Sequence, residues 1–185
     1  MKGDGPQGDE TSDADLVERG ARGDEHALDM LVRRHQAAAY RVAVSILRDG
    51  DAAQDVVQDA FIKAFRALGG FRGDSSFGTW LLTITANEAR GALRRALRRK
   101  ETSMEVVAVL ASEATAPDQA TIVTLEARRA RDMLGRLPEK QRLAVTLRIE
   151  EGLSFREIGD IIGSSEGAAR VNYFHGIRRL RELMK

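Results

Sequence analysis

The most constraining feature of this sequence is an apolar stripe with helical spacing that ends at a group of glycines. Between Asp51 and Leu68, apolar residues recur every three or four positions, at Ala53, Val56, Val57, Ala60, Phe61, Ala64, Phe65 and Leu68. This spacing predicts an amphipathic helix, which we expect Asp51 to cap in a capping box with Gln54. The opposite, polar face carries Asp55, Gln58, Asp59 and Lys63.

Three glycines around Phe71 interrupt this pattern: Gly69, Gly70 and Gly73. Because glycine accepts backbone angles that helix formers resist, we expect a turn here and a second helix starting at Ser75 or Ser76. That helix begins apolar and ends with six bases, Arg90, Arg94, Arg95, Arg98, Arg99 and Lys100. A solvated end matched to the helix dipole is one interpretation. The density of cations favours the other, a phosphate-binding surface.

The N-terminal part predicts a tail and two further helices. Residues 1–12 are rich in glycine and acid, which is typical of a disordered tail. Asp13 can cap a short helix, and residues 24–48 again show helical spacing. We expect this second helix to pack antiparallel to the one that begins at Asp51, with His35 partly buried in the core rather than acting as a ligand.

The periodicity lapses over residues 101–120, which contain Pro117 and mix small residues with acids. We interpret this stretch as a flexible linker between residues 13–100 and residues 121–185. In the second unit, Ser154 and Glu157 form a capping-box pattern, Gly163 breaks the chain, and a serine pair starts another helix. The predicted fold is all-α, with two small helical domains and a helix-turn-helix in the second.

The last helix has an inner and an outer side. Its inner side carries Ala169, Tyr173, Ile177 and Leu180, and its outer side carries Arg170, Val171, Phe174, His175 and Arg178. Small residues at the entrance of the helix and bases along its exposed side suit a DNA major groove about 12 Å wide. A helical hairpin that binds nothing is the alternative.

Composition excludes several classes of function. The chain has no cysteine, so disulfides, thiolate metal sites and thiol nucleophiles are absent. Its three histidines are scattered. Asp51, Asp55 and Asp59 share a helix face and could hold a divalent cation, but no Glu-x-x-His motif completes such a site. We therefore expect no metal, no cofactor and no enzyme. With no apolar run long enough to span a membrane, we expect a cytoplasmic protein without membrane insertion.

Two stretches of the chain carry a family resemblance. DVVQDAFIKAFRAL with FRGDSSFGTWLLTITAN, over residues 55–87, resembles the second conserved region of the sigma-70 family of bacterial RNA polymerase sigma factors. LPEKQRLAVTLRIEEGLSFREIGDIIGSSEGAARVNYFHGIRRLREL, over residues 137–183, resembles the fourth region. The chain is most similar to the small extracytoplasmic-function (ECF) group. A stand-alone helix-turn-helix regulator is the alternative, but it would leave residues 51–100 without a role.

The resemblance implies a specificity subunit that binds core RNA polymerase and promoter DNA and is held inactive by an anti-sigma factor, in a stress or envelope response. By position, the core-binding residues would be Asp55, Gln58, Asp59 and Lys63. At the minus-ten element, Phe71 and Asn87 would capture bases, and the backbone would be contacted by Arg90, Arg94 and Arg95. At the minus-thirty-five element, the last helix would contribute Arg170, Val171, Phe174, His175, Arg178 and Arg179.

Overall fold

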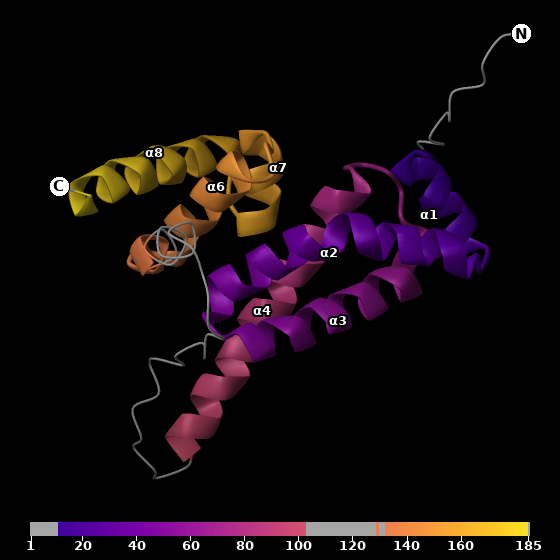
Figure 1. Ribbon diagram of the computed structural model, residues 1–185, viewed down its shortest axis with the longest axis horizontal. Helices are drawn as coiled ribbons and strands as arrows, with labels where there is room; N and C mark the ends of the chain where they lie inside the picture. The colour runs from indigo at the N-terminus through magenta and orange to yellow at the C-terminus, as the bar shows by residue number, and fades with distance from the viewer. Residues whose placement is uncertain (1–10, 103–128, 130–131, 185) are drawn as a thin grey trace, which may run out of the picture.

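The computed structural model describes residues 11–102, 129 and 132–184, and it is helical (Figure 1). The N-terminal domain contains α1 (Asp13–Ala21), α2 (Glu25–Leu47), α3 (Gly50–Ala67), the short 3-10 helix η1 (Leu68–Gly70) and α4 (Phe77–Thr102). The C-terminal domain contains α6 (Glu139–Ile149), α7 (Phe155–Ile162) and α8 (Glu166–Leu183). No strand occurs in these residues, so the all-α prediction is confirmed.

The apolar stripes predicted from the sequence build the core of the N-terminal domain. Helices α2, α3 and α4 pack against one another in every pairing, and α1 lies on α2. Leu31, Val42 and Leu81 are fully buried between them, and Phe61 is nearly so. Burial of apolar side chains from each helix stabilises the bundle and fixes which face of α3 and α4 remains outside.

Two helix caps differ from the prediction. The cap of α3 lies two residues earlier than expected, at Asp49, which accepts hydrogen bonds from the backbone amides of Asp51 and Ala52. Likewise Ser12, rather than Asp13, caps α1. The carboxylate of Asp13 is instead engaged with α2, where it accepts hydrogen bonds from Arg34 at 2.9 Å and from His35 at 2.6 Å.

The C-terminal domain contains the predicted helix-turn-helix. Ser154 and Glu157 form the predicted capping box of α7. Gly163 ends this helix with a φ of 64°, a left-handed conformation that favours glycine. The side chain of Ser165 then caps α8. At Gly159 a Cβ atom would lie 2.9 Å from the carbonyl oxygen of Ser164, so the turn between α7 and α8 requires glycine at this position.

The two domains contact each other directly. Helix α2 packs against α6, and α4 packs against α7 (Figure 1). Helix α4 runs to Thr102, two residues into the predicted linker, because no glycine or proline interrupts residues 95–102. The rest of that linker, and most of the predicted N-terminal tail, lie outside the described residues.

Candidate nucleic-acid interface

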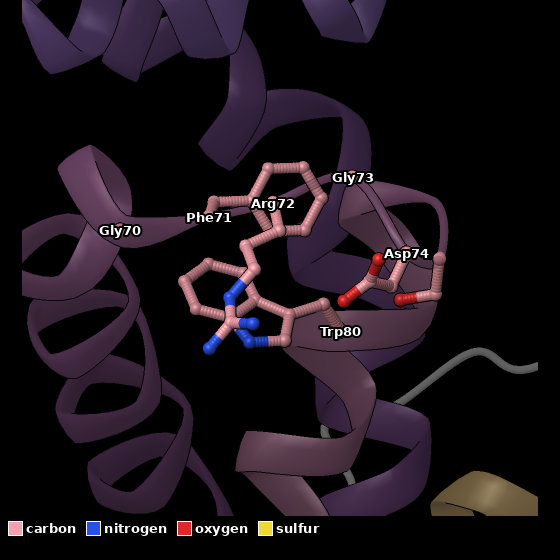
Figure 2. A pocket seen from close by; sticks show the side chains of 7 residues that line it. Gly70, Phe71, Arg72, Gly73, Asp74 and Trp80 are labelled. Carbon is pink, nitrogen blue, oxygen red and sulfur yellow. The ribbon is translucent and has the colours of Figure 1, made fainter.

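An aromatic cavity lies where the chain turns from η1 into α4. Phe71 and Trp80 both line it and pack against each other, with their ring centroids 4.9 Å apart, and the cavity measures about 320 Å³ (Figure 2). It is also lined by Gly70, Arg72, Gly73, Asp74 and Ser75. Gly73 has a φ of 74°, which lets the loop curl around the cavity. A half-open aromatic cavity beside a guanidinium group suits an unstacked nucleobase.

Predicted base-contacting residues on α4 follow the cavity along one stripe of the helix. Asn87 is exposed and lies seven residues after Trp80, which places it on nearly the same face about 10 Å further along the axis. Arg94 lies another seven residues on and is also exposed. The stripe therefore joins an aromatic cavity, an amide and a cation, in that order.

The predicted phosphate-contacting arginines do not share one environment. Arg94 and Arg95 are exposed. The side chain of Arg90 is only 20% exposed and points to the C-terminal domain, where its Nε donates to Glu139 at 2.9 Å. The structure therefore separates Arg90 from the other two.

The predicted polymerase-binding residues of α3 lie on its outer face. Asp55, Gln58 and Asp59 are exposed. Lys63 is exposed as well, but its Nζ lies 2.7 Å from a carboxylate oxygen of Glu88 on α4. An aliphatic residue, Ile62, is 42% exposed and lies one turn beyond Gln58 and Asp59. The outer face of α3 thus combines acids with an apolar side chain.

The outer side of α8 is exposed as predicted. The six candidate residues are all solvent-exposed: Arg170, Val171, Phe174, His175, Arg178 and Arg179. On the inner side Ala169 is buried, whereas Tyr173, Ile177 and Leu180 are half-buried. Helix α8 comes very close to α6 at Gly176, where a Cβ atom would lie 2.7 Å from Cγ2 of Val145. This contact determines which side of α8 faces outward.

Arg170 is held in place by two neighbours. Its guanidinium donates to Glu166 at 2.9 Å and lies over the Phe155 ring, with Cζ 5.2 Å from the ring centroid. Arg148 contacts the same ring at 5.0 Å. An arginine constrained in this way loses less side-chain entropy when it binds a nucleic acid.

Sequence reasoning missed or misjudged several of these residues. Trp80 is half-buried: it packs against the hydrophobic core and also lines the cavity. Ile62 was not predicted because periodicity assigns it to the polar face of α3. Gly176 was not predicted as the helix-crossing point. Spacing alone carries no signal for Ile62. For Gly176 there was a signal, because it lies seven residues after Ala169 on the inner side of α8, where a glycine allows a close helix crossing.

Metal-binding and membrane-spanning elements are not found in the part of the chain that the structure describes. No group of three or more histidine or carboxylate side chains gathers there to hold a metal ion. Among those same residues, no helix combines the length and apolar character needed to cross a membrane.

Comparison with known proteins accounts for both domains. Residues 31–99 match the family model for sigma-70 region 2, and residues 127–180 match that for sigma-70 region 4. The RNA polymerase sigma-H factor of Pseudomonas aeruginosa is 39% identical over 171 residues, covering 88% of each chain. The ECF RNA polymerase sigma-E factor of Escherichia coli K12 is 37% identical over 175 residues, covering 90% of this chain and 91% of its own.

Solved structures are similar to this chain as well. The sigma factor RpoE of Bartonella quintana, in complex with the anti-sigma factor NepR, is 27% identical, with a TM-score of 0.72 over 84% of this chain and 95% of its own. CnrH, in complex with the cytosolic domain of CnrY, is 28% identical, with a TM-score of 0.68 over 93% of this chain and 96% of its own. The chain therefore belongs to the sigma-70 family of RNA polymerase sigma factors, in the ECF group.

Proposed function

We propose that this sigma factor divides promoter recognition between its two domains. Residues 13–100 would bind core polymerase and the minus-ten element, residues 121–185 would bind the minus-thirty-five element, and residues 101–120 would link them. The observation that carries this proposal is the aromatic cavity at Phe71 and Trp80, followed on α4 by Asn87 and Arg94. A flipped base needs an aromatic surface, a hydrogen-bonding amide and a cation for its phosphate.

At the minus-ten element, Phe71 would stack on a nontemplate-strand base, with the Trp80 ring packed against Phe71. Asn87 would hydrogen-bond the edge of a base, because an amide presents a donor and an acceptor together. Arg90, Arg94 and Arg95 would contact the strand backbone. For Arg90 this role requires its contact with Glu139 to break.

Core polymerase would bind the outer face of α3. The exposed carboxylates of Asp55 and Asp59 would meet a basic surface, and Ile62 would supply apolar contact area next to Gln58. Lys63 would contribute less than the sequence predicts, since Glu88 already neutralises its charge.

At the minus-thirty-five element, the exposed side of α8 would enter the major groove. Arg170 would contact a base edge, Val171 and Phe174 would pack against thymine methyl groups, and His175 would lie at the edge of the contact. Arg178 and Arg179, further along the helix, would grip phosphates.

A similar solved structure supports regulation by an anti-sigma factor. The Bartonella quintana relative is described in complex with an anti-sigma factor. We therefore infer that this chain also has an anti-sigma partner, works without catalytic activity of its own, and acts in the cytoplasm, where bacterial core polymerase is found.

Transcription by reconstituted polymerase tests the proposal. Promoters selected from a random library by core polymerase with this chain should share two sequence elements. Asn87→Ala should then relax base preference in the downstream element, at a cost of about 1 to 3 kcal/mol in discrimination, while core affinity stays unchanged. Identical promoter selectivity in the Asn87→Ala variant would contradict the role assigned to α4.

A further inference from the structure

Helix α1 has no role in the proposed function, yet it packs against both elements that flank the aromatic cavity. The loop that forms the cavity leaves η1 and enters α4. Helix α1 packs against η1 at Gly20, where a Cβ atom would lie 3.1 Å from Cδ2 of Leu68. It also packs against α4. A helix that supports both ends of a short loop restricts the shapes that the loop can adopt.

The connection from α1 to the start of α4 runs through His35 of α2. Nε2 of His35 donates to the carboxylate of Asp13 at 2.6 Å. The imidazole also packs edge-on against Phe77, with ring centroids 5.3 Å apart and an angle of 61° between the rings. Gly78 leaves room for it, since a Cβ atom there would lie 3.1 Å from Cε1 of His35. Imidazole suits this place because it combines a polar nitrogen with an aromatic ring.

Phe77 extends this connection to the cavity. It is 3% exposed, and its ring centroid lies 6.3 Å from that of Phe71 and 6.0 Å from that of Trp80. These are the two rings that line the cavity (Figure 2). Aromatic pairs prefer particular relative orientations, so a fixed Phe77 favours one arrangement of its neighbours. A continuous set of contacts therefore runs from the carboxylate of Asp13 to both rings of the cavity.

The carboxylate of Asp13 is itself held at both oxygens. Oδ1 accepts a hydrogen bond from Nη1 of Arg34 at 2.9 Å, while Oδ2 accepts the one from His35. Both donors belong to α2, so the carboxylate bridges two adjacent side chains and orients the imidazole. A side chain that only filled space beside Phe77 would need no such partner, because an apolar residue packs there without a polar atom to satisfy.

Restraint of the cavity rings matters for binding a base. Phe71 lies between Gly70 and Gly73, and Gly73 has a φ of 74°, so the loop backbone by itself restrains this ring little. A ring that is ordered before it binds loses less conformational entropy when a base stacks on it. The contacts of Phe71 with Phe77 and Trp80 supply that order.

We propose that His35 is a positioning residue for base capture: held by Asp13 of α1, it braces Phe77 and so fixes the two cavity rings in an orientation that accepts a nucleobase. Helix α1 thereby supports DNA binding without contacting DNA. The proposal rests on the proposed function, because it takes the cavity as the site of the flipped base.

The test uses the full chain and its only tryptophan, Trp80, whose fluorescence reports on the cavity. Acrylamide quenching measures access to the indole, and a random-sequence single strand of about 12 nucleotides is the DNA probe. His35→Phe keeps an aromatic ring beside Phe77 but cannot bind Asp13. His26→Phe is its matched control, because it makes the same substitution at an exposed position of α2.

A second variant breaks the same contact from α1. Asp13→Ala removes the carboxylate, and Asp15→Ala is the matched control at an exposed position of the same helix. Both test variants should show increased quenching of Trp80 and bind the probe about fivefold more weakly than their controls. The double variant Asp13→Ala/His35→Phe should lose little more than either single variant, since both remove one shared contact.

Three results would overturn the positioning role. The first is quenching and probe affinity equal to the controls. The second is additive losses in the double variant, because Asp13 would then not act through His35. The third is an equal loss of affinity for core polymerase, which binds α3 in the proposed function, since that would assign the effect to the stability of the whole domain.

Phe71→Ala separates this proposal from the proposed function. It should weaken probe binding at least as much as His35→Phe. If Phe71→Ala leaves probe affinity unaltered, base capture in the cavity fails, and quenching of Trp80 still shows whether His35 braces the rings. If Phe71→Ala weakens binding while the Asp13 and His35 variants match their controls, base capture stands and the positioning role alone is wrong.

Discussion

The guanidinium carbon of Arg170 on α8 lies 5.2 Å from the centre of the Phe155 ring on α7. This contact joins the two helices of the helix-turn-helix at the side chain proposed to read DNA. Because Glu166 binds the same guanidinium from within α8, Arg170 is restrained from two directions. The first helix of the motif thus shapes the recognition surface of the second without itself entering the groove.

Replacing Phe155 should therefore weaken binding at the upstream element. Phe155→Leu keeps an apolar side chain but removes the aromatic face, and we expect a loss of about 0.5 to 1 kcal/mol in affinity for the matched duplex. Phe155→Tyr should restore it. Fluorescence anisotropy with matched and scrambled duplexes measures the effect, and equal affinities for the Leu and Tyr variants would show that the ring does not orient Arg170.

The outer face of α3 should control assembly with core polymerase. Asp55→Arg combined with Asp59→Arg should lower core affinity by at least about tenfold, because it turns attraction into like-charge repulsion. Ile62→Ala should cost about 1 kcal/mol, typical of a modest interface residue. Competition against a labelled sigma factor measures both.

Leu97→Ala provides the matched control for Ile62→Ala, since Leu97 is 53% exposed and belongs to α4 rather than α3. Its core affinity should equal that of the unmodified chain. If the Ile62 and Leu97 variants behave alike, the apolar contribution assigned to α3 is wrong.

Helix positions could be predicted from the sequence because each helix carries a continuous apolar stripe and recognisable ends. The capping box of Ser154 and Glu157 is a local pattern, and it forms as predicted. The cap of α3 was assigned to Asp51 instead of Asp49, although both carboxylates are suitable chemically. Which of them caps depends on the path of the chain out of α2, where Arg48 adopts a φ of 58°. Spacing contains no information about that path.

The docking of the two domains could not be predicted for a related reason. Arg41 and Glu151, 110 residues apart in the chain, belong to no periodic pattern and have many alternative partners in a sequence so rich in charge. Similarly, nothing in its sequence neighbourhood distinguishes Arg90 from Arg94. The structure separates them because Arg90 donates to the carbonyl oxygen of Ile161 on α7, whereas Arg94 is exposed.

The crossing of α6 and α8 should be sensitive to a single methyl group. In Gly176→Ala the new Cβ would lie 2.7 Å from Val145 and 3.2 Å from the carbonyl oxygen of Gln141. We expect a loss of about 1 to 3 kcal/mol in stability from overpacking. Gly167→Ala is the matched control, since a Cβ there meets nothing within 4 Å, and alanine should stabilise the helix by up to about 1 kcal/mol. Chemical denaturation measures the free energy of unfolding of both variants. A loss for Gly176→Ala with a gain for Gly167→Ala would support the prediction, and changes of the same sign would contradict it.

Acid should loosen α1 through Asp13. Partial burial opposes ionisation of this carboxyl, but hydrogen bonds and charge from Arg34 and His35 outweigh it and hold the pKa of Asp13 below its usual value of 3.8. A lowered pKa in the folded state stabilises the protein above about pH 3.8, and this contribution is lost as the pH falls through the folded value. Asp13→Asn should therefore be less stable than the unmodified chain at pH 6, with the difference shrinking towards pH 3.

Amide hydrogen exchange in α1, followed at several pH values after correction for the intrinsic rate, measures that trend. The exposed Asp15→Asn variant is the control, because Asp15 has no contact with α2 among the hydrogen bonds described. A difference between Asp13→Asn and the unmodified chain that stays constant from pH 6 to pH 3 would show that the carboxylate does not hold α1 in its charged form.

The two ends of α8 should affect DNA binding differently. Arg170 is fixed near the start of the helix by Glu166 and Phe155, whereas Arg178 lies two turns further on and is exposed. Arg170→Ala should cost about 1 to 3 kcal/mol on the preferred upstream sequence and relax preference there, because a base contact is lost. Arg178→Ala should weaken binding to all sequences alike and reduce the slope of log affinity against log salt by about one unit, because a phosphate contact is lost.

Titrations of both variants on matched and scrambled duplexes at several salt concentrations separate the two roles. If both variants lose equal affinity on both duplexes, α8 holds the backbone without reading bases, and selectivity at this element must come from the shape of the DNA.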